Sequence, residues 1–337
     1  MTTRYSRQEL FGGIGREGQA RLREARVAIV GCGALGSLLA EVLCRAGIGS
    51  IRLIDRDFVE PSNLQRQALF TETDAEQSIP KAVAAADHLA RINREVQVIP
   101  EVSDLSPDNL FLLQNVHLVL DGTDNFQTRY LMNDFAWKYG TPWIYGACVG
   151  SSGVASAFVP DSFPCLRCIF ETEPQPGSSP TCDTAGIIWP AVGMVVSYQV
   201  AAAFKILCGQ TVDPEIFQLD VWDGSYRTVS LQKAKRSNCP TCGLKEFPSI
   251  NQSAGFQTSL CGRDAVQVKP ALANASLDLD QIAERWRKVG QCFQNPFLVK
   301  LILPQNELVL FPDGRAMIKG TTDLTRARDI YAKYIGS

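Results

Sequence analysis

Apolar and polar positions alternate in blocks along the first half of the chain. An apolar run at 27–30 is followed by a glycine-rich turn at 31–36 and by a segment rich in Leu and Ala at 37–46. A second apolar run at 50–54 ends at Asp55. This order predicts a strand, a tight turn, a helix and a second strand that carries an acidic residue at its tip.

The alternation continues into the middle of the chain. A helical pattern at 82–92 precedes four apolar runs of strand length, at 96–99, 116–120, 143–145 and 154–159. Alternating helices and strands build a parallel sheet that is covered on both faces. The chain is therefore predicted to have an α/β fold, a doubly wound and mostly parallel sheet of the Rossmann-like kind.

A long apolar segment at 187–207 follows a loop rich in Pro and Ser. Pro190 suits a first helical turn and Gly209 suits a C-terminal cap. The segment approaches the length of a membrane helix, which is about 20 residues. Three polar side chains interrupt it, Ser197, Gln199 and Lys205. We therefore predict a core helix and no membrane span.

The last part of the chain predicts a small α+β module. Its elements are a strand, a helix, two strands and a second helix, at 265–268, 277–289, 298–303, 307–311 and 323–335. At 337 residues the chain exceeds one ordinary domain of roughly 100–200 residues. We predict a main domain over 1–248, a polar and irregular linker over 249–264, and a C-terminal domain over 265–337.

Composition and charge narrow the classes of function. Hydrophobic residues make up 45% and charged residues 20% of the chain, as in a globular protein with a sizeable core. With 33 basic and 35 acidic side chains the net charge is -2, which argues against nucleic acid or an anionic membrane as the partner. Residues 1–10 lack the apolar core of a signal peptide, so a cytoplasmic location is expected. In a reducing compartment, the 11 cysteines favour metal ligands, reactive thiols or packing over disulfides.

Three glycines, Gly31, Gly33 and Gly36, open the first predicted helix. They allow the backbone to turn tightly and to approach a phosphate chain at the helix N-terminus. A carboxylate at Asp55 accepts hydrogen bonds from ribose hydroxyls whether the ligand is NAD or ATP. These residues alone therefore leave both a dinucleotide site and an ATP site open.

Charged residues further along the chain favour ATP. Arg66 and Lys81 can hold a triphosphate, and a carboxylate near them can hold the Mg²⁺ that ATP brings. A nicotinamide site does not need this much positive charge. Each of these residues alone is typical of an exposed polar side chain, but the ordered set with Asp124 predicts an ATP site.

Several motifs in order resemble the ThiF/MoeB/HesA adenylyltransferases, bacterial relatives of the ubiquitin-activating enzymes. The resemblance covers residues 4–243 and rests on the segments 4–8, 31–36, 62–67, 80–82 and 123–125 and on two cysteine pairs. It implies ATP as a substrate and a homodimer in which Arg7 reaches into the other subunit's ATP site. Two positions depart from the family pattern, Ser78 where glycine is usual and Gly122 where cysteine is common.

The resemblance also implies roles within the site. Asp55 binds ribose, Asp124 binds Mg²⁺, and Asp57 belongs to the nucleotide-binding set. Four residues contact the phosphates, Asn63, Arg66, Gln67 and Lys81. The expected catalytic residues are Arg7, Arg66, Lys81, Asp124 and Cys182.

The two cysteine pairs both have C-x-x-C spacing, Cys165 with Cys168 and Cys239 with Cys242. Four thiolates suit a tetrahedral structural Zn²⁺ that leaves no open position for chemistry. The alternative is four buried or exposed thiols without a metal.

Cys182 lies between the loop rich in Pro and Ser and the long apolar helix. A thiol near a helix N-terminus has a lowered pKa and more thiolate. In the family that the chain resembles, this position carries a cysteine that can link covalently to the carrier or to a sulfur donor. Cys261 is the next candidate, whereas the remaining cysteines and both histidines are expected to have no chemical role.

The expected function is ATP-dependent adenylation of the C-terminal glycine of a ubiquitin-like sulfur-carrier protein that ends in Gly-Gly. The tail from Cys261 onward resembles longer ThiF-type proteins, which favours a ThiS-like carrier, thiamin thiazole synthesis and a sulfur donor such as a cysteine desulfurase. MoeB-like activation of the small subunit of molybdopterin synthase and adenylation of a peptide stay open. Two alternatives from other classes are a Rossmann oxidoreductase and a non-catalytic scaffold that binds a ubiquitin-like protein.

Overall fold

The computed structural model describes residues 4–174, 181–251, 257–260, 265–268 and 277–336. By its contacts the chain divides into two compact units. The first comprises Met1–Pro174 and Ala185–Gln252, and the second comprises Ser253–Ser337 with the short segment Gln175–Thr184. The division into a main domain, a linker and a C-terminal domain at the predicted boundaries stays a prediction.

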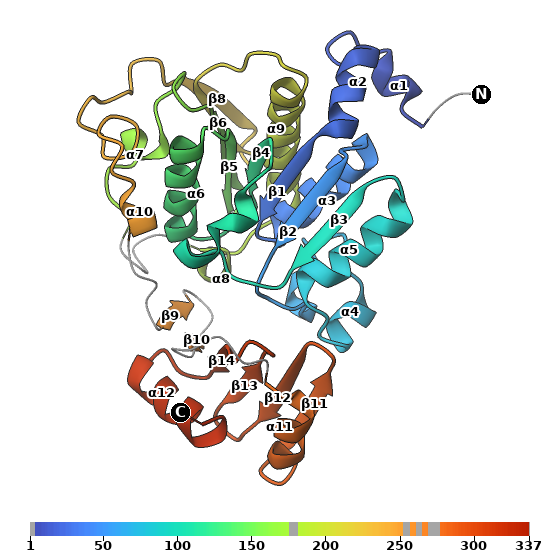
Figure 1. Ribbon diagram of the computed structural model, residues 1–337, viewed down its shortest axis with the longest axis vertical. Coiled ribbons are helices and arrows are strands. Elements are labelled where there is room, and N and C mark those ends of the chain that lie inside the picture. Colours follow the sequence, from blue (N-terminus) through green and yellow to red (C-terminus); the bar gives the residue numbers. More distant parts are fainter. Residues whose placement is uncertain (1–3, 175–180, 252–256, 261–264, 269–276, 337) are drawn as a thin grey trace. The chain divides into compact units, whose positions relative to one another are not determined.

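The first unit is built on one eight-stranded sheet with the order β3-β2-β1-β4-β5-β6-β7-β8 (Figure 1). Strands β1 to β5 run parallel, and β6, β7 and β8 are each antiparallel to the strand before them. The strands are β1 (Arg26–Val30), β2 (Ser50–Ile54), β3 (Gln97–Glu101), β4 (Leu118–Asp121), β5 (Trp143–Val149), β6 (Ser152–Phe158), β7 (Glu215–Asp220) and β8 (Ser225–Ser230). The predicted doubly wound, mostly parallel sheet is confirmed.

Helices cover both faces of this sheet because successive strand residues point to opposite sides. In β1, Val27 and Ile29 belong to the core cluster that includes α3, α5 and α9, whereas Ala28 and Val30 belong to the cluster that includes α6. The helical segments of this part of the chain are α1 (Ser6–Glu9), α2 (Gly15–Glu24), α3 (Ala34–Ala46), η1 (Pro61–Asn63), α4 (Glu72–Glu76), α5 (Lys81–Ile92), η2 (Pro107–Leu113), α6 (Phe126–Tyr139), α7 (Leu166–Ile169), α8 (Cys182–Ala185), α9 (Trp189–Leu207) and α10 (Pro248–Asn251).

Among the described residues, α9 is the one helix long and apolar enough to cross a membrane by length and composition. Its mean hydropathy is 1.4 over the most apolar window, and 44% of that window is buried. In the structure α9 packs on α3 and on strands β5 and β6. Its Gln199 is fully buried and donates from Nε2 to the carbonyl of Asp121 at 2.9 Å. The prediction of a core helix is therefore confirmed.

The second unit has a six-stranded sheet with the order β11-β12-β13-β14-β10-β9, antiparallel throughout. Helices α11 (Leu279–Trp286) and α12 (Leu324–Tyr334) share a core with one face of this sheet. The strands are β9 (Gln257–Leu260), β10 (Ala265–Val268), β11 (Gln291–Asn295), β12 (Leu298–Ile302), β13 (Glu307–Leu310) and β14 (Ala316–Lys319).

The expectation of an irregular stretch over 249–264 is wrong in part, because it contains most of α10 and all of β9. Strand β9 pairs with β10 along four residues, so backbone pairing stabilises a segment that lacks an apolar pattern. The polar strand β11 was not predicted for the same reason, since its formation depends on its neighbour β12. Local patterning misses strands whose stability comes from a partner strand.

Candidate nucleotide-binding site and cysteine cluster

The carboxyl ends of β1 and β4 lie side by side, where the strand order of the parallel part reverses direction. In open α/β sheets, ligands bind in the crevice at this reversal. Strand β1 leads into Gly31, whose φ of 85° favours glycine. A Cβ on Gly31 would stand 2.6 Å from the carbonyl oxygen of Gly122, and a Cβ on Gly36 would stand 1.8 Å from that of Gly31. A Cβ on Gly122 would in turn collide with Gly31. Neighbouring backbone therefore excludes a side chain at Gly31, Gly36 and Gly122.

Gly33 differs from the other glycines of the turn because it has room beside it. A Cβ there would meet only the Nε2 atom of Gln67, at 3.9 Å. Gly33 is the N-cap of α3, and no side chain caps this helix. The N-terminus of α3 is thus free of a capping side chain, as a phosphate-binding helix N-terminus requires.

Asp55 ties the glycine turn to the end of β2. Its Oδ2 accepts a hydrogen bond from the backbone N–H of Cys32 at 2.5 Å, and its Oδ1 accepts one from the N–H of Asp57 at 2.7 Å. Both carboxylates are buried. Burial, reinforced by the Asp57 charge, raises the pKa of Asp55 above its ordinary value, while the nearby Lys81 acts in the opposite direction.

Lys81 supplies a positive charge close to Asp55 and Asp57. It is the first residue of α5, it is 3% exposed, and its Nζ lies 3.6 Å from Oδ2 of Asp57. Its backbone N–H also donates to the carbonyl of Asp57 at 2.9 Å. The site thus places a buried ammonium group beside two buried carboxylates.

The segment that includes η1 carries the remaining predicted phosphate ligands. Asn63 is buried and its Oδ1 accepts a hydrogen bond from the N–H of Glu60 at 3.2 Å. Gln67 is 3% exposed, and its Oε1 has no hydrogen-bond partner within the described part of the chain. Arg66 is half-buried and donates to the carbonyl of Ser62 at 2.9 Å. Gln67 therefore offers an unused buried acceptor next to the glycine turn.

The turn that carries Asp124 is shaped by a buried ion pair that the sequence did not reveal. Asp121 is fully buried and accepts at Oδ2 from Nε of Arg129 at 2.9 Å. Its other oxygen accepts from the N–H and the hydroxyl of Thr123, at 2.8 and 2.7 Å. Arg129 in turn donates to the Thr123 carbonyl at 2.7 Å. Asp124 is exposed and follows directly in this bonded turn.

Four cysteines lie together in the first unit, with all their Sγ atoms within 4.8 Å of one another. The sulfur atoms of Cys165 and Cys239 are 3.4 Å apart, and those of Cys168 and Cys242 are 3.3 Å apart. All four side chains are buried. Zinc–sulfur bonds of about 2.3 Å in a tetrahedron place sulfurs roughly 3.8 Å apart, so the cluster fits one metal ion.

Comparison with known proteins places the chain in a family. The model of the ThiF family matches residues 5–241. The chain belongs to the ThiF family. The ThiS adenylyltransferase of Bacillus subtilis is 45% identical over 339 residues, which is 100% of each chain. A sulfur carrier protein adenylyltransferase of Thermus thermophilus is 36% identical over 77% of this chain and 96% of its own length.

Solved structures show the same fold for this ThiF-family chain. A crystal structure of Escherichia coli MccB with ATP superimposes with a TM-score of 0.63 and 22% sequence identity. The match covers 72% of this chain and 75% of MccB. At this identity, the likeness concerns the fold alone.

Arg7 stands apart from the buried residues of this ThiF-family site. It is exposed on α1, and within the described residues it makes no hydrogen bond or ion pair. The short helix is anchored by its neighbours. Tyr5 is buried against Gly47 and accepts from Nδ2 of Asn93 at 2.8 Å, and Gln8 donates to the carbonyl of Ala46 at 3.0 Å.

Cys182 lies between the loop rich in Pro and Ser and the long helix, as the sequence indicated. It is half-buried and is the first residue of the one-turn helix α8, and α9 begins at Trp189. The activation of this thiol stays a prediction. Cys261 lies outside the described residues.

Both departures from the family pattern have local structural settings. Ser78 is buried with a φ of 48°, a left-handed conformation that favours glycine. Gly122 touches the glycine turn so closely that a side chain would collide there.

Both histidines make structural contacts. His88 Nε2 lies 2.8 Å from Oδ2 of Asp74, and Nδ1 of His117 accepts from the N–H of Arg26 at 3.0 Å.

Proposed function

We propose that this ThiF-family chain uses ATP to adenylate the C-terminal glycine of a small ubiquitin-like sulfur-carrier protein of the ThiS kind. The observation that carries the proposal is the end-to-end match, at 45% identity, to an enzyme named for that activity. The fold supports it by gathering Asp55, Gln67 and Lys81 beside the glycine turn. We also propose a cytoplasmic location and thiamin thiazole synthesis as the pathway.

The nucleotide would enter at the glycine turn. Asp55 would accept the ribose hydroxyls, because its carboxylate is held at the end of β2 by two backbone N–H groups. The phosphates would pass the N-terminus of α3, where the unpaired Oε1 of Gln67 leaves its amide free to reorient. The phosphates would then meet Lys81, whose ammonium group lies beside Asp57. Asn63 and Arg66, on the segment that includes η1, would contact the phosphates as well.

Asp124 would hold the Mg²⁺ that accompanies ATP, since it is an exposed carboxylate on a turn fixed from below by Asp121 and Arg129. The carboxylate oxygen of the carrier's last glycine attacks the α-phosphorus, and the bond to pyrophosphate breaks. A carboxylate is already nucleophilic at neutral pH, so no base is needed. Positioning and neutralisation of the developing phosphate charge supply the rate enhancement.

The test is ATP–pyrophosphate exchange measured with three acceptors, a ThiS-like carrier, a MoaD-like carrier and a short peptide. Exchange with the ThiS-like carrier, lost when its last glycine is deleted, supports the proposal. Stronger exchange with one of the other two acceptors would support the MoeB-like or the peptide alternative. Thermal stabilisation by NADH but not by ATP would favour an oxidoreductase, and carrier binding without any exchange would favour a scaffold.

A persulfide sulfur on the donor, a cysteine desulfurase or a similar protein, would attack the acyl carbon and displace AMP, which leaves the carrier joined to the donor through an acyl disulfide. The thiolate of Cys182, the candidate for a covalent link, would then attack the donor's cysteine sulfur. This step releases the thiocarboxylate on the carrier and leaves a disulfide between Cys182 and the donor, which a cellular thiol would reduce. With Cys182→Ala, exchange of pyrophosphate should continue while thiocarboxylate formation falls, which mass spectrometry of the carrier would detect. Unchanged sulfur transfer would remove Cys182 from the mechanism.

We further propose a homodimer in which Arg7 completes the ATP site of the other subunit. Its exposure on an anchored helix supports this role. Arg7→Ala and Lys81→Met subunits are each expected to be inactive alone. In a mixed dimer, one site would receive an intact Lys81 and an intact Arg7, so mixing should restore activity. No restoration would place Arg7 in its own subunit's site.

The four clustered cysteines would hold one Zn²⁺ in a structural role. Their burial and sulfur separations support a closed tetrahedral site. Elemental analysis should find about one zinc per chain. A metal-free chain that stays folded and active would contradict the assignment.

A further inference from the structure

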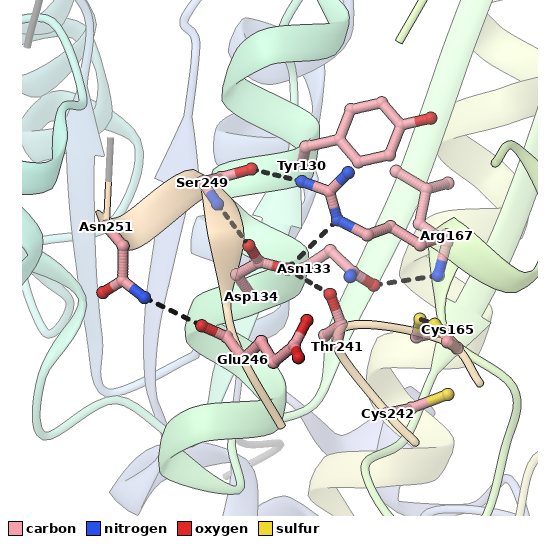
Figure 2. Close-up of polar contacts among 12 residues, drawn as sticks. Tyr130, Asn133, Asp134, Cys165, Arg167, Thr241, Cys242, Glu246, Ser249 and Asn251 are labelled. Carbon is pink, nitrogen blue, oxygen red and sulfur yellow. Dashed lines mark hydrogen bonds and ion pairs between the residues drawn. The ribbon is translucent and has the colours of Figure 1, made fainter. Parts of the chain in front are cut away.

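Helix α6 carries a fully buried carboxylate, Asp134, next to the two loops that hold the cysteines. Oδ1 of Asp134 accepts hydrogen bonds from the hydroxyl of Thr241 and, at 3.4 Å, from Nε of Arg167. Its Oδ2 accepts from the backbone N–H of Ser249 at 2.7 Å. Figure 2 shows these groups converging on Asp134 from three separate segments. One side chain thus joins parts of the chain that are far apart in sequence.

Two of these partners stand inside the cysteine pairs. Arg167 lies between Cys165 and Cys168, and Thr241 lies between Cys239 and Cys242. The two pairs come from distant segments, after β6 and after β8 respectively. Asp134 is therefore a point at which both cysteine-bearing loops meet outside the sulfur cluster.

The neighbours of Asp134 fix the first loop further. Asn133 accepts at Oδ1 from the N–H of Leu166 at 2.8 Å. The Arg167 guanidinium stacks on the Tyr130 ring at 4.2 Å and also donates to the hydroxyl of Ser249. Arg236 donates to the Arg167 carbonyl at 2.8 Å. Each loop is thus held by hydrogen bonds that do not involve the four cysteine side chains.

Burying an ion pair rarely adds stability in itself, because the cost of desolvation offsets the attraction. Asp134 and Arg167 have side-chain exposures of 0% and 9%, so this cost applies fully. Groups that surround a metal site from outside orient the ligands and slow their movement. Asp134 bonds to a residue of each cysteine loop, so it is placed to orient the ligands of a metal ion.

We propose that Asp134 is a positioning residue for the four-cysteine metal centre, holding the two loops at the separation that one ion requires. The inference rests on the proposed metal site. It predicts that loss of Asp134 contacts speeds metal release and loosens the coordination geometry while the cysteines themselves remain intact.

The experiment measures transfer of zinc from the full chain to a chelating dye, and the absorption spectrum of the cobalt-loaded chain. Asp134→Ala should release metal about 10- to 100-fold faster than the original chain and change the cobalt bands. Thr241→Val, an isosteric change that removes one donor to Asp134, should give a smaller change in the same direction. This variant also tests the proposal if Asp134→Ala fails to fold.

Asn93→Ala is the matched control. Asn93 is also fully buried and donates to the Tyr5 hydroxyl and the Cys44 carbonyl, but it contacts none of the four clustered cysteines. It should lower thermal stability while leaving the release rate and cobalt spectrum unchanged. Release from Asp134 and Thr241 variants at the rate of the original chain would overturn the proposal. A purified original chain without metal would instead overturn the metal site itself.

Discussion

The predicted nucleotide site has a buried half and an exposed half, and they are built differently. Asp55, Asp57 and Lys81 are all at most 9% exposed and are bonded to one another or to backbone groups. Arg7 and Asp124 are exposed. A charge beneath the surface needs partners from its own chain, because desolvation is costly. The charged residues of the buried half therefore have partners in their own chain before a ligand arrives, whereas Arg7 and Asp124 are open to contact from outside.

The largest expected effect comes from the exposed half. Asp124→Ala should lower the rate of ATP–pyrophosphate exchange by about 100- to 1000-fold, the usual result of losing one preorganised stabiliser of developing charge. Because Asp124 is exposed, the melting temperature of the ligand-free chain should stay nearly constant. Gln127→Ala, also exposed on the adjoining helix, serves as the control and should keep full exchange.

Lys81→Met should affect both catalysis and folding, unlike Asp124→Ala. Exchange should fall about 100-fold through loss of phosphate contacts. The two carboxylates near the missing ammonium group also lose their compensation, which should lower the free energy of unfolding by about 3 to 5 kcal/mol. Urea denaturation of the ligand-free chain would measure this loss. If the variant and the original chain are equally stable, Lys81 does not stabilise the buried carboxylates of Asp55 and Asp57.

Stability of the buried half should depend on pH through Asp55. Its raised pKa means that the folded chain keeps this proton to a higher pH than the unfolded chain does. Between the two pKa values the folded state binds more protons, so the free energy of unfolding falls as pH rises, by about 1.4 kcal/mol for each unit of the shift. Asp55→Asn should flatten this part of the profile from pH 4 upward, as urea titrations at several pH values would show. A steeper fall of the unfolding free energy with pH in the Asp55→Asn variant would contradict a raised pKa for Asp55.

The smallest effect is expected at the cap of α6. Asn125 accepts at Oδ1 from the N–H of Thr128 at 2.9 Å and follows Asp124 directly. Asn125→Ala should lower the free energy of unfolding by about 1 kcal/mol. Asn125→Asp restores the acceptor and should restore stability. If the alanine variant loses exchange activity as well, the turn that carries Asp124 depends on the cap and not only on Asp121 and Arg129.

Sequence patterns predicted the features that repeat locally or lie close in the chain. The glycine turn, β1, α3 and β2 follow one another directly, so their order is visible as periodicity. The C-x-x-C spacing likewise indicated that the cysteine pairs belong together. Asp134 was missed because its partners, such as Thr241, are distant in sequence, and Arg129 was missed because its pairing with Asp121 joins a helix to the end of a strand, which no periodicity reveals. An arginine or aspartate on a helix with buried neighbours is the only local signal for such residues.

Helix α6 carries Asn125 as its cap, Arg129 four residues later and Asp134 five residues after that. The first two shape the Asp124 turn, and the third joins the loops of the cysteine cluster. Adding or deleting one residue within this helix would rotate everything beyond it by about 100° and shift it by about 1.5 Å. Residues 125–134 should therefore tolerate a substitution at the exposed Gln127 but no change in length, so that this stretch sets a fixed spacing between the two sites.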